Sequence, residues 1–415
     1  MMGVALSHGV SVKIRALGTF SISLAAVTSC GGSQITLTAI PIDAAAADAV
    51  GANVDAGGQI ASFNPALDPS FATLGTISGA LSNWTPSGVA VDAQGRVVLS
   101  GPSDPLSEPP ADIVLRLTED GVLDTTFAQS GREYVPVDAA VWGQAVGLLD
   151  QDAIAVLGAA EFQGQPGAFG VRLSPDGAPD PTFSLGSGLL SSGQFTAGLW
   201  RSDGSGFLLG TNGVARFTVS GDLDVTFGTN GLIPQADCGA AAADGTLWTA
   251  SGRRLSRFQS NGTLDGSFGT AGNVDLSSLG LELTAVHAVV LRPQGGAVVV
   301  GSHVASGAFE VDILALTQTG SVDPAYAAGL PVSVQSAGAP VGAAQTPDGR
   351  TFVWTTNGGI IELGVDGSAS ALRSLSLGGT VMAATLDGAE RLVVVALDAT
   401  NPFDSTWDVQ RYLTH

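Results

Sequence analysis

The stretch NGTLDGSFGTAG, from Asn261 to Gly272, decides the fold of this chain because it recurs along the sequence. This copy opens on a turn, continues through an LDxxF segment and closes on glycine. A period of about 40 to 60 residues made of short strands is typical of β-propeller blades. The other copies, some of them degenerate, are NPALDPSFATLG (64–75), EDGVLDTTFAQSG (119–131), PDGAPDPTFSLGSG (175–188), SGDLDVTFGTNG (220–231), TGSVDPAYAAG (319–329) and VDGSASALRSL (365–375).

Each period predicts four strands. In the first full unit, the strands are expected at 88–92, 96–101 and 112–118, and the segment after the LDxxF motif makes the fourth. The aliphatic second-strand pattern occurs seven times in all. We therefore predict an all-β protein, a β-propeller of seven four-stranded blades. The later second strands are expected at 153–158, 206–210, 246–252, 297–301, 351–356 and 391–396.

The two ends of the repeat array complement each other. The sequence stops at Thr414-His415, where the next turn and LDxxF segment would begin, and the half-copy at 64–75 is the missing piece. Pairing of the N- and C-terminal segments would close the ring and leave no open sheet edge between them. The segment Gln59 to Phe63 repeats the third-strand pattern, so a slipped closure or an eighth partial blade stays open.

The charge of the chain excludes one class of partner. From Cys30 onward there are 14 arginines, no lysine and 37 acidic residues. Such a surface repels phosphate backbones, so we expect no nucleic-acid binding. The 57 glycines and the excess of aspartate over glutamate suit a protein of strands and turns.

Residues 1–29 predict a lipoprotein signal peptide. Lys13 and Arg15 precede an apolar run that is too short to span a bilayer, and Val27-Thr28-Ser29-Cys30 follows. This end resembles the bacterial lipoprotein signal with its lipobox. The resemblance implies that the Cys30 thiol receives a diacylglycerol and that cleavage occurs before it. The alternative is an ordinary secretory signal that happens to contain a cysteine.

The domain boundaries follow from this signal. We expect residues 30–58, rich in Ala, Gly and Asp, to be a flexible spacer and residues 59–415 to form the propeller. Contact with the membrane would occur only through the lipid anchor, and we expect a monomer. No Asp follows Cys30 directly, which favours the outer membrane of a bacterial envelope over the inner one.

The repeated motif resembles that of the delta-60 repeat family, which comprises bacterial β-propeller-like repeats. The shared features are an arginine-containing strand, a DG turn and an LDxSFG segment, and they extend from about Asn64 to the C-terminus. The sixth and seventh units depart from the motif. The resemblance implies the propeller fold and no particular activity.

Two motif positions have a structural explanation. An aspartate two residues before Ser or Thr can accept backbone N–H groups and fix the turn, and the aromatic residue after it is expected in the seam between blades. The competing interpretation is a calcium loop, although each copy offers only one carboxylate. The aspartates are Asp68, Asp124, Asp180, Asp224, Asp265 and Asp323, and the aromatic residues are Phe71, Phe127, Phe183, Phe227, Phe268 and Tyr326.

Catalytic motifs are absent from the sequence. There is no GxSxG, HExxH or CxxC, and the histidines after Cys30 are His287, His303 and His415. We therefore expect neither a metal site nor a cofactor. Cys238 has no partner once Cys30 is acylated, and we expect it to be a buried small hydrophobe rather than a reactive thiol.

A candidate ligand site lies where the first strands of the blades converge on the ring axis. Most residues at their entry positions are polar, and two tryptophans precede this ring of residues and could form an aromatic rim. The alternative is that these side chains are solvated loop ends. The ring consists of Ser87, Gln144, Thr196, Asp237, His287, Val341 and Thr380, and the rim of Trp84 and Trp142.

Three functions are compatible with these features. The first is a cell-envelope lipoprotein that presents a rigid propeller as a binding module for an envelope protein, a peptide or a glycan, without catalysis. The second is a propeller-type hydrolase, lactonase or lyase with Asp237 and His287 at the channel mouth. The third is a purely structural surface component.

Overall fold

The computed structural model describes the chain from residue 66 onward, with gaps. The predicted signal peptide, Cys30, the spacer and the segment Gln59 to Phe63 lie outside the described residues. The described ranges are 66–72, 75–79, 84–103, 111–137, 140–162, 165–185, 195–281, 283–305, 307–336, 338–375, 377, 379–398 and 406–414.

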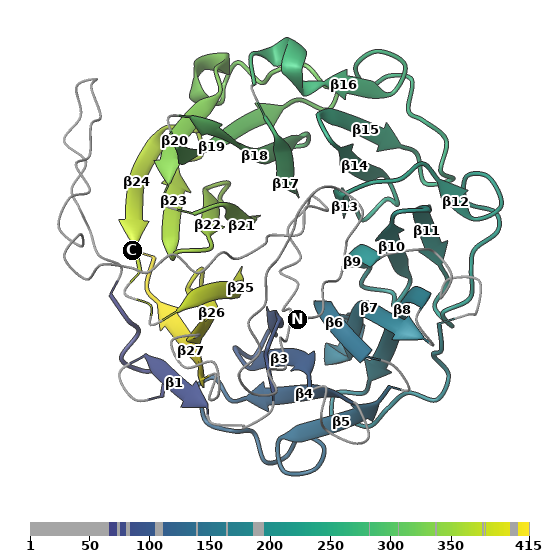
Figure 1. Ribbon diagram of the computed structural model, residues 1–415, viewed down its shortest axis with the longest axis vertical. Coiled ribbons are helices and arrows are strands. Elements are labelled where there is room, and N and C mark those ends of the chain that lie inside the picture. The colour runs from purple at the N-terminus through teal and green to yellow at the C-terminus, as the bar shows by residue number, and fades with distance from the viewer. Residues whose placement is uncertain are drawn as a thin grey trace, which may run out of the picture.

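Seven antiparallel sheets stand radially around one axis, as Figure 1 shows. In the described residues six sheets have four strands and one has three. The first strand of each blade lies nearest the axis and contacts the first strands of both neighbouring blades. The prediction of a seven-bladed propeller is therefore confirmed.

The blades are numbered here in chain order, and their strands run from the axis outward. Blade 1 contains β2 (Gly88–Val91), β3 (Val97–Pro102), β4 (Ala111–Leu117) and β5 (Arg132–Pro136). Blade 2 contains β6 (Ala140–Leu148), β7 (Ile154–Phe162) and β8 (Gln165–Leu173), with the 3₁₀ turn η1 (Asp150–Asp152). Blade 3 contains β9 (Phe195–Trp200), β10 (Gly206–Gly210), β11 (Gly213–Phe217) and β12 (Leu232–Ile233).

The second half of the ring repeats this order. Blade 4 contains β13 (Cys238–Ala241), β14 (Leu247–Ser251), β15 (Arg254–Phe258) and β16 (Asn273–Asp275), followed by η2 (Leu276–Leu279). Blade 5 contains β17 (Ala285–Leu291), β18 (Ala297–Ala305), β19 (Ala308–Leu316) and β20 (Val332–Ser336), with η3 (Ala327–Gly329). Blade 6 contains β21 (Pro340–Gln345), β22 (Thr351–Thr355), β23 (Gly359–Leu363) and β24 (Ala369–Ser374).

Blade 7 closes the ring with strands from both ends of the described chain. It contains β25 (Thr380–Leu386), β26 (Leu392–Asp398) and β27 (Thr406–Tyr412), and β1 (Thr76–Gly79) pairs with β27 as the outermost strand. The half-copy continues this pairing, because the Asp68 amide donates to the Arg411 carbonyl at 2.8 Å. The predicted closure by pairing of the N- and C-terminal segments is confirmed.

The hydrophobic core is divided among the seams of the ring. Seven clusters of buried side chains each join two neighbouring blades. The second strands, such as β3 and β22, are buried along nearly their whole length because a neighbouring blade packs on each face. The outer strand β20 instead alternates between partly buried and exposed residues before it ends on a buried one. Burial places Cys238 in the seam between blades 4 and 5, which confirms the prediction for this residue.

An arginine, an aspartate and an aromatic ring form a repeated unit, here called the clamp. In blade 1, Nε of Arg116 donates to Oδ2 of Asp124 at 2.8 Å, and the guanidinium lies 4.5 Å from the centre of the Phe127 ring. Oδ1 of Asp124 accepts the backbone N–H and the hydroxyl of Thr126. Both carboxylate oxygens are thus occupied, which supports the structural interpretation of the motif over the calcium loop.

Each clamp reaches forward to the next blade. Nη1 of Arg116 donates to the Pro175 carbonyl at 2.5 Å, and the Ala128 amide donates to the Asp176 carbonyl at 2.7 Å. Phe127 packs in the same seam, as predicted for the aromatic position. Equivalent clamps are Arg172–Asp180–Phe183, Arg216–Asp224–Phe227, Arg257–Asp265–Phe268 and Arg411–Asp68–Phe71.

The clamp changes in the units whose motif is degenerate. In blade 5, Ala315 occupies the arginine position, and Arg292 from the preceding turn instead pairs with Asp323 and lies over Tyr326. In blade 6, Glu362 stands at the arginine position and no aromatic residue follows. The seam between blades 6 and 7 therefore lacks a clamp among the described residues, and Arg350 bridges Glu362 to Glu390 of blade 7.

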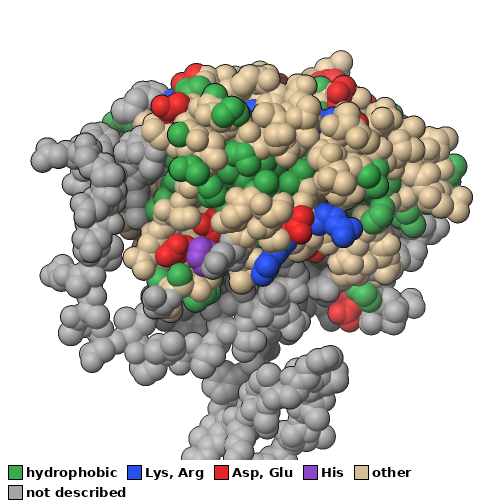
Figure 2. Space-filling view, turned by 90° about the horizontal axis from the view of Figure 1, so that it is seen from above, with side chains coloured by type: hydrophobic (Ala, Val, Ile, Leu, Met, Phe, Trp, Pro, Cys, Tyr) green, Lys and Arg blue, Asp and Glu red, His purple; other side chains and the backbone are tan. Residues whose placement is uncertain are grey.

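The outer edge of the ring carries both charged and apolar side chains. Figure 2 shows this outer edge, with basic side chains beside acidic ones and a band of apolar side chains between polar regions. No helix in the described ranges is long and apolar enough to cross a bilayer.

Candidate functional site

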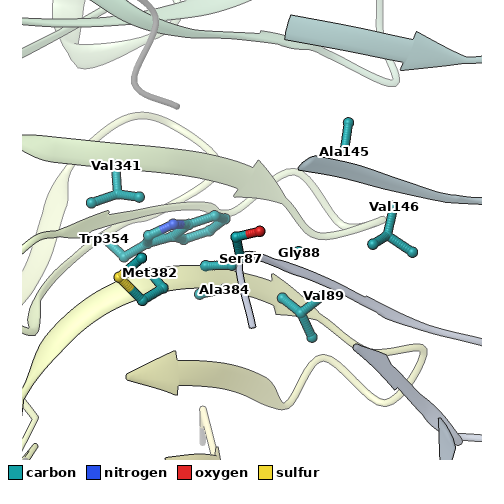
Figure 3. A pocket seen from close by; sticks show the side chains of 10 residues that line it. Ser87, Gly88, Val89, Ala145, Val146, Val341, Trp354, Met382 and Ala384 are labelled. Carbon is teal, nitrogen blue, oxygen red and sulfur yellow. The ribbon is translucent and has the colours of Figure 1, made fainter. Parts of the chain in front are cut away.

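A cavity of about 220 Å³ opens among the innermost strands of four blades. Blades 1 and 2 border it with β2 and β6, and blades 6 and 7 with β21, β22 and β25. Its lining side chains are uncharged and mostly apolar (Figure 3), but polar atoms make up more of its accessible surface than apolar ones. The lining residues are Ser87, Gly88, Val89, Ala145, Val146, Val341, Trp354, Met382, Ala383 and Ala384.

Bulges shape the mouth of this cavity. The register of β21 against β22 skips Val341, and that of β25 against β26 skips Met382. A bulge inserts one residue that has no partner in the ladder and re-aims its side chain. Both skipped residues line the cavity. The same skip occurs at Thr196 and at His287, four residues before the last paired residue of the inner strand.

Trp354 reaches the cavity from the second strand of blade 6. It pairs across the ladder with Gly342 of β21, and a Cβ atom on Gly342 would lie 2.9 Å from Cζ2 of the indole. Only a glycine at this position lets the ring lie flat against the inner strand. Figure 3 shows the indole beside Met382 and Ser87.

Ser87 supplies the only hydroxyl of the described lining, which also contains the indole N–H of Trp354. Its amide donates to the Ser100 carbonyl at 2.9 Å, which fixes the residue at the entry to β2. Its Oγ is buried and has no hydrogen-bond partner among the described residues. A buried hydroxyl without a partner is destabilising, so a bound group that pairs with it would relieve this cost.

Two predicted ring residues have structural roles outside the cavity lining. Oδ2 of Asp237 accepts the Gly252 amide at 2.8 Å and so holds the turn beyond β14. His287 is buried, and its Nε2 lies 2.8 Å from Oγ of Ser302. Burial lowers the pKa of His287 to about 4, and its Nδ1 has no partner among the described residues. The two side chains are not brought together at the cavity.

The other ring positions differ in their placement. Thr380 lies exposed at the start of β25, and the residue in register with His287 and Val341 is Met382, two positions later. Gln144 and Thr196 lie on inner strands β6 and β9, but their side chains fall outside the described atoms.

The predicted aromatic rim is not formed by Trp84. This side chain is 2% exposed, and its Nε1 donates to the Gly101 carbonyl at 2.9 Å. It packs edge-on against Trp407 at 5.2 Å in the seam between blades 7 and 1. Trp142 lies on β6, with its side chain outside the described atoms. The indole that borders the cavity is that of Trp354 instead.

The described lining of the cavity contains no side chain that could act as a general acid or base near neutral pH. Within the described part of the chain, no set of three His, Cys, Asp or Glu side chains is arranged to hold a metal ion. Burial raises the pKa of the Cys238 thiol far above its usual value, so this cysteine stays protonated and unreactive.

Known proteins support the fold. Residues 95–127 match a family described as a domain of unknown function (DUF5122), beta-propeller, which confirms a propeller repeat family over that unit. A search of curated proteins found no match.

Solved structures similar to this chain share its architecture at low sequence identity. The WD40 beta propeller domain of Doa1 is 10% identical with a TM-score of 0.53, over 84% of this chain and 97% of that one. BBS1N in complex with ARL6DN is 11% identical with a TM-score of 0.51, over 85% and 98%. Catalytically inactive virginiamycin B lyase from Staphylococcus aureus with quinupristin is 11% identical with a TM-score of 0.50, over 81% and 98%.

Proposed function

We propose that this protein is a binding module of the bacterial cell envelope, anchored through a lipid on Cys30, and that the axial cavity is its ligand site. The observation that carries the proposal is the cavity itself, which combines an unpartnered Ser87 hydroxyl with the Trp354 indole. Few convergent polar groups in a mostly apolar hollow are typical of ligand sites.

The rigidity of the ring supports a binding role. Clamps join the blades around most of the ring and hold the inner strands at fixed positions. A preorganised site loses little conformational entropy on binding. Asp237 and His287, the residues that an enzyme at this mouth would use, instead hold a turn and a buried hydrogen bond, so the geometry favours binding over turnover.

The partner that we propose is an envelope protein, a peptide or a glycan. The solved propellers described above include one in complex with a protein and one with a small molecule. The lipid anchor would place the propeller at a membrane surface, the outer membrane in preference to the inner one. The acidic composition makes an anionic polymer a poor partner.

The test is capture from the native envelope by a carboxylate-directed crosslinker, read by mass spectrometry. Amine-directed reagents would miss the chain, which has no lysine after Cys30. We compare the wild type with Ser87→Leu, which fills the cavity, and with Ser100→Ala, which removes another buried unpartnered hydroxyl from the same blade outside the lining. We expect a stoichiometric partner with the wild type and Ser100→Ala only. Equal capture by all three proteins would refute the assignment of the cavity.

The anchor has its own test. Cys30→Ala should shift the protein from the membrane fraction to the soluble fraction and abolish labelling with a radioactive fatty acid. Persistence in the membrane fraction without label would overturn the lipid anchor.

A further inference from the structure

We propose that the axial cavity binds an uncharged aromatic ring that carries one hydrogen-bonding group, of the size of phenol or indole. The ring would contact Trp354 and Met382, and its polar group would pair with the Ser87 hydroxyl. This inference rests on the proposed function, because it names the ligand class of the same cavity.

The volume limits the ligand to about one ring system. An apolar cavity of roughly 150 Å³ binds benzene. The present cavity, at about 220 Å³, is larger and admits a substituted single ring or a small fused pair. Because the cavity is open to solvent, a peptide or a sugar chain would place one side chain or one ring inside it and extend out of it.

The lining excludes charge. None of the lining residues is ionisable, so a charged group buried there would lose its hydration without an ion pair in return. An aliphatic ligand would use the valines but not the indole. Trp354 and Met382 are 6% and 8% exposed, and a ligand ring would contact the parts of the indole and of the thioether that border the cavity.

The position of Ser87 predicts one polar group on the ring. Figure 3 shows the Ser87 hydroxyl among the lining side chains, between the indole of Trp354 and Ala145. Its Oγ is buried and has no partner among the described residues, so it can pair with a ligand group, as donor or acceptor, once the side chain turns into the cavity. A phenol hydroxyl or an indole N–H would satisfy it, whereas toluene would leave it unpaired.

The ring can come from a free compound or from an aromatic side chain of a partner. The experiment separates the two by calorimetric titration of the full-length lipoprotein in detergent. The probes are phenol, indole, toluene, cyclohexanol, benzoate and the blocked amino acid N-acetyl-tyrosinamide. Ser87→Leu in the same buffer provides the baseline for partition into detergent.

We expect the wild type to bind phenol and indole more tightly than either cyclohexanol or benzoate. Ser87→Ala should weaken phenol about fivefold and leave toluene unchanged, because one neutral hydrogen bond contributes about 1 kcal/mol. Ser100→Ala should match the wild type. Trp354→Phe should weaken every aromatic probe, and its melting curve shows whether the fold persists.

Three results have different meanings. Tight binding of N-acetyl-tyrosinamide assigns the site to an aromatic side chain of a partner. If phenol binds but N-acetyl-tyrosinamide does not, the site is assigned to a free compound. Both results support an aromatic ligand. Binding of none of the ring probes above the Ser87→Leu baseline overturns the inference. In that case, partner capture that still depends on Ser87 would leave the proposed function standing.

Discussion

Arg411 and Asp68 lie 343 positions apart in the chain and form a buried ion pair, with Nε donating to Oδ2 at 2.8 Å. Their side chains are 1% and 5% exposed. Burial by itself raises the pKa of Asp68, but the hydrogen bonds from Ser70 and the charge of Arg411 outweigh it, so that the pKa lies below its usual value. This clamp ties the first described segment to the last strand.

Loss of this arginine should destabilise the whole ring. Arg411→Met removes the buried hydrogen-bonded partner of Asp68 and leaves the carboxylate only the longer pair with Arg391 at 3.3 Å. We therefore expect a loss of about 3 kcal/mol or less, at the low end of the cost of breaking a buried pair. We expect a large fall in Tm by calorimetry, and a smaller one for Asp68→Asn combined with Arg411→Met. The control is Arg172→Met in the more accessible clamp of blade 2, where a loss nearer 1 kcal/mol is expected. Equal losses at both clamps would contradict a special role in closure.

Stability should depend on pH through His287. Its pKa is about 4 in the folded protein and about 6.5 when the chain is unfolded. Between these values the unfolded chain binds the extra proton, so stability falls as the pH falls from about 6.5 to 4, by up to about 3 kcal/mol. His287→Gln, which cannot be protonated, should flatten the urea midpoint over this range. The clamp carboxylates, whose pKa values are lowered, add their own loss only below about pH 4.

The glycine of each DG turn should not tolerate a side chain where the motif copy of the preceding blade packs against it. Gly262 has φ +83°, and a Cβ there would lie 2.4 Å from the Gly228 nitrogen of the preceding blade. Gly262→Ala should therefore cost about 2 kcal/mol or more in free energy of unfolding. Gly266 in the same motif copy has open space around its Cβ position and is the matched control. A similar fall in Tm for Gly266→Ala would argue against the packing explanation.

One position should gain stability. Gly266 occupies the motif position where Pro69, Pro181 and Pro324 stand in other copies, and its amide donates no backbone hydrogen bond within the described residues. Gly266→Pro restricts the unfolded chain and should stabilise the protein by about 0.5–1 kcal/mol. The measurement is the urea midpoint, with Gly266→Ala as the intermediate step. A fall in the midpoint would show that the turn in blade 4 differs from the proline-containing turns.

The seam between blades 6 and 7 should open first. It lacks the clamp, and the Arg350–Glu390 pair that spans it is partly exposed, with 21% and 25% of the side chains accessible. Exposed ion pairs contribute little and are screened by salt. We expect amides of β22 and β26 to exchange with deuterium at least about tenfold faster than those of β3 and β7, whose seam contains the buried Arg116–Asp124 clamp, and faster still at high salt. Uniform exchange around the ring would exclude a weak seam.

The fold could be predicted because each repeat carries its own local signals. The DG turn, the aspartate and the aromatic residue can be recognised within one copy of the motif, and the number of copies gives the number of blades. The forward reach of Arg116 to Pro175 could not be read in this way, since it joins residues 59 positions apart. The sequence showed that an arginine recurs on the third strand, but it did not show that this arginine binds a carbonyl of the next blade.

The candidate site was harder to predict than the fold. Ser87 and Val341 were identified from their distance to the following turn, and both line the cavity. Thr380 was chosen instead of Met382 because the alignment at this strand was wrong by two residues. Met382, like His287 and Val341, lies four residues before the last paired residue of its strand. In the sequence, Trp354 is one of several apolar residues of a second strand and nothing marks it as a site residue. Its pairing with Gly342, which brings the indole to the inner strand, is known only from the structure.

The closing clamp follows the same pattern as the clamps inside the chain: arginine on a third strand, aspartate and phenylalanine after it, and a carbonyl of the following blade. In this unit the arginine comes from the last described strand and the aspartate from the first described segment, yet the atoms meet as they do elsewhere. A circularly permuted gene, cut within any other blade and joined across this one, should therefore encode the same ring. Duplication of a whole unit would likewise carry a complete set of contacts to its neighbour, so such arrays can lengthen one blade at a time.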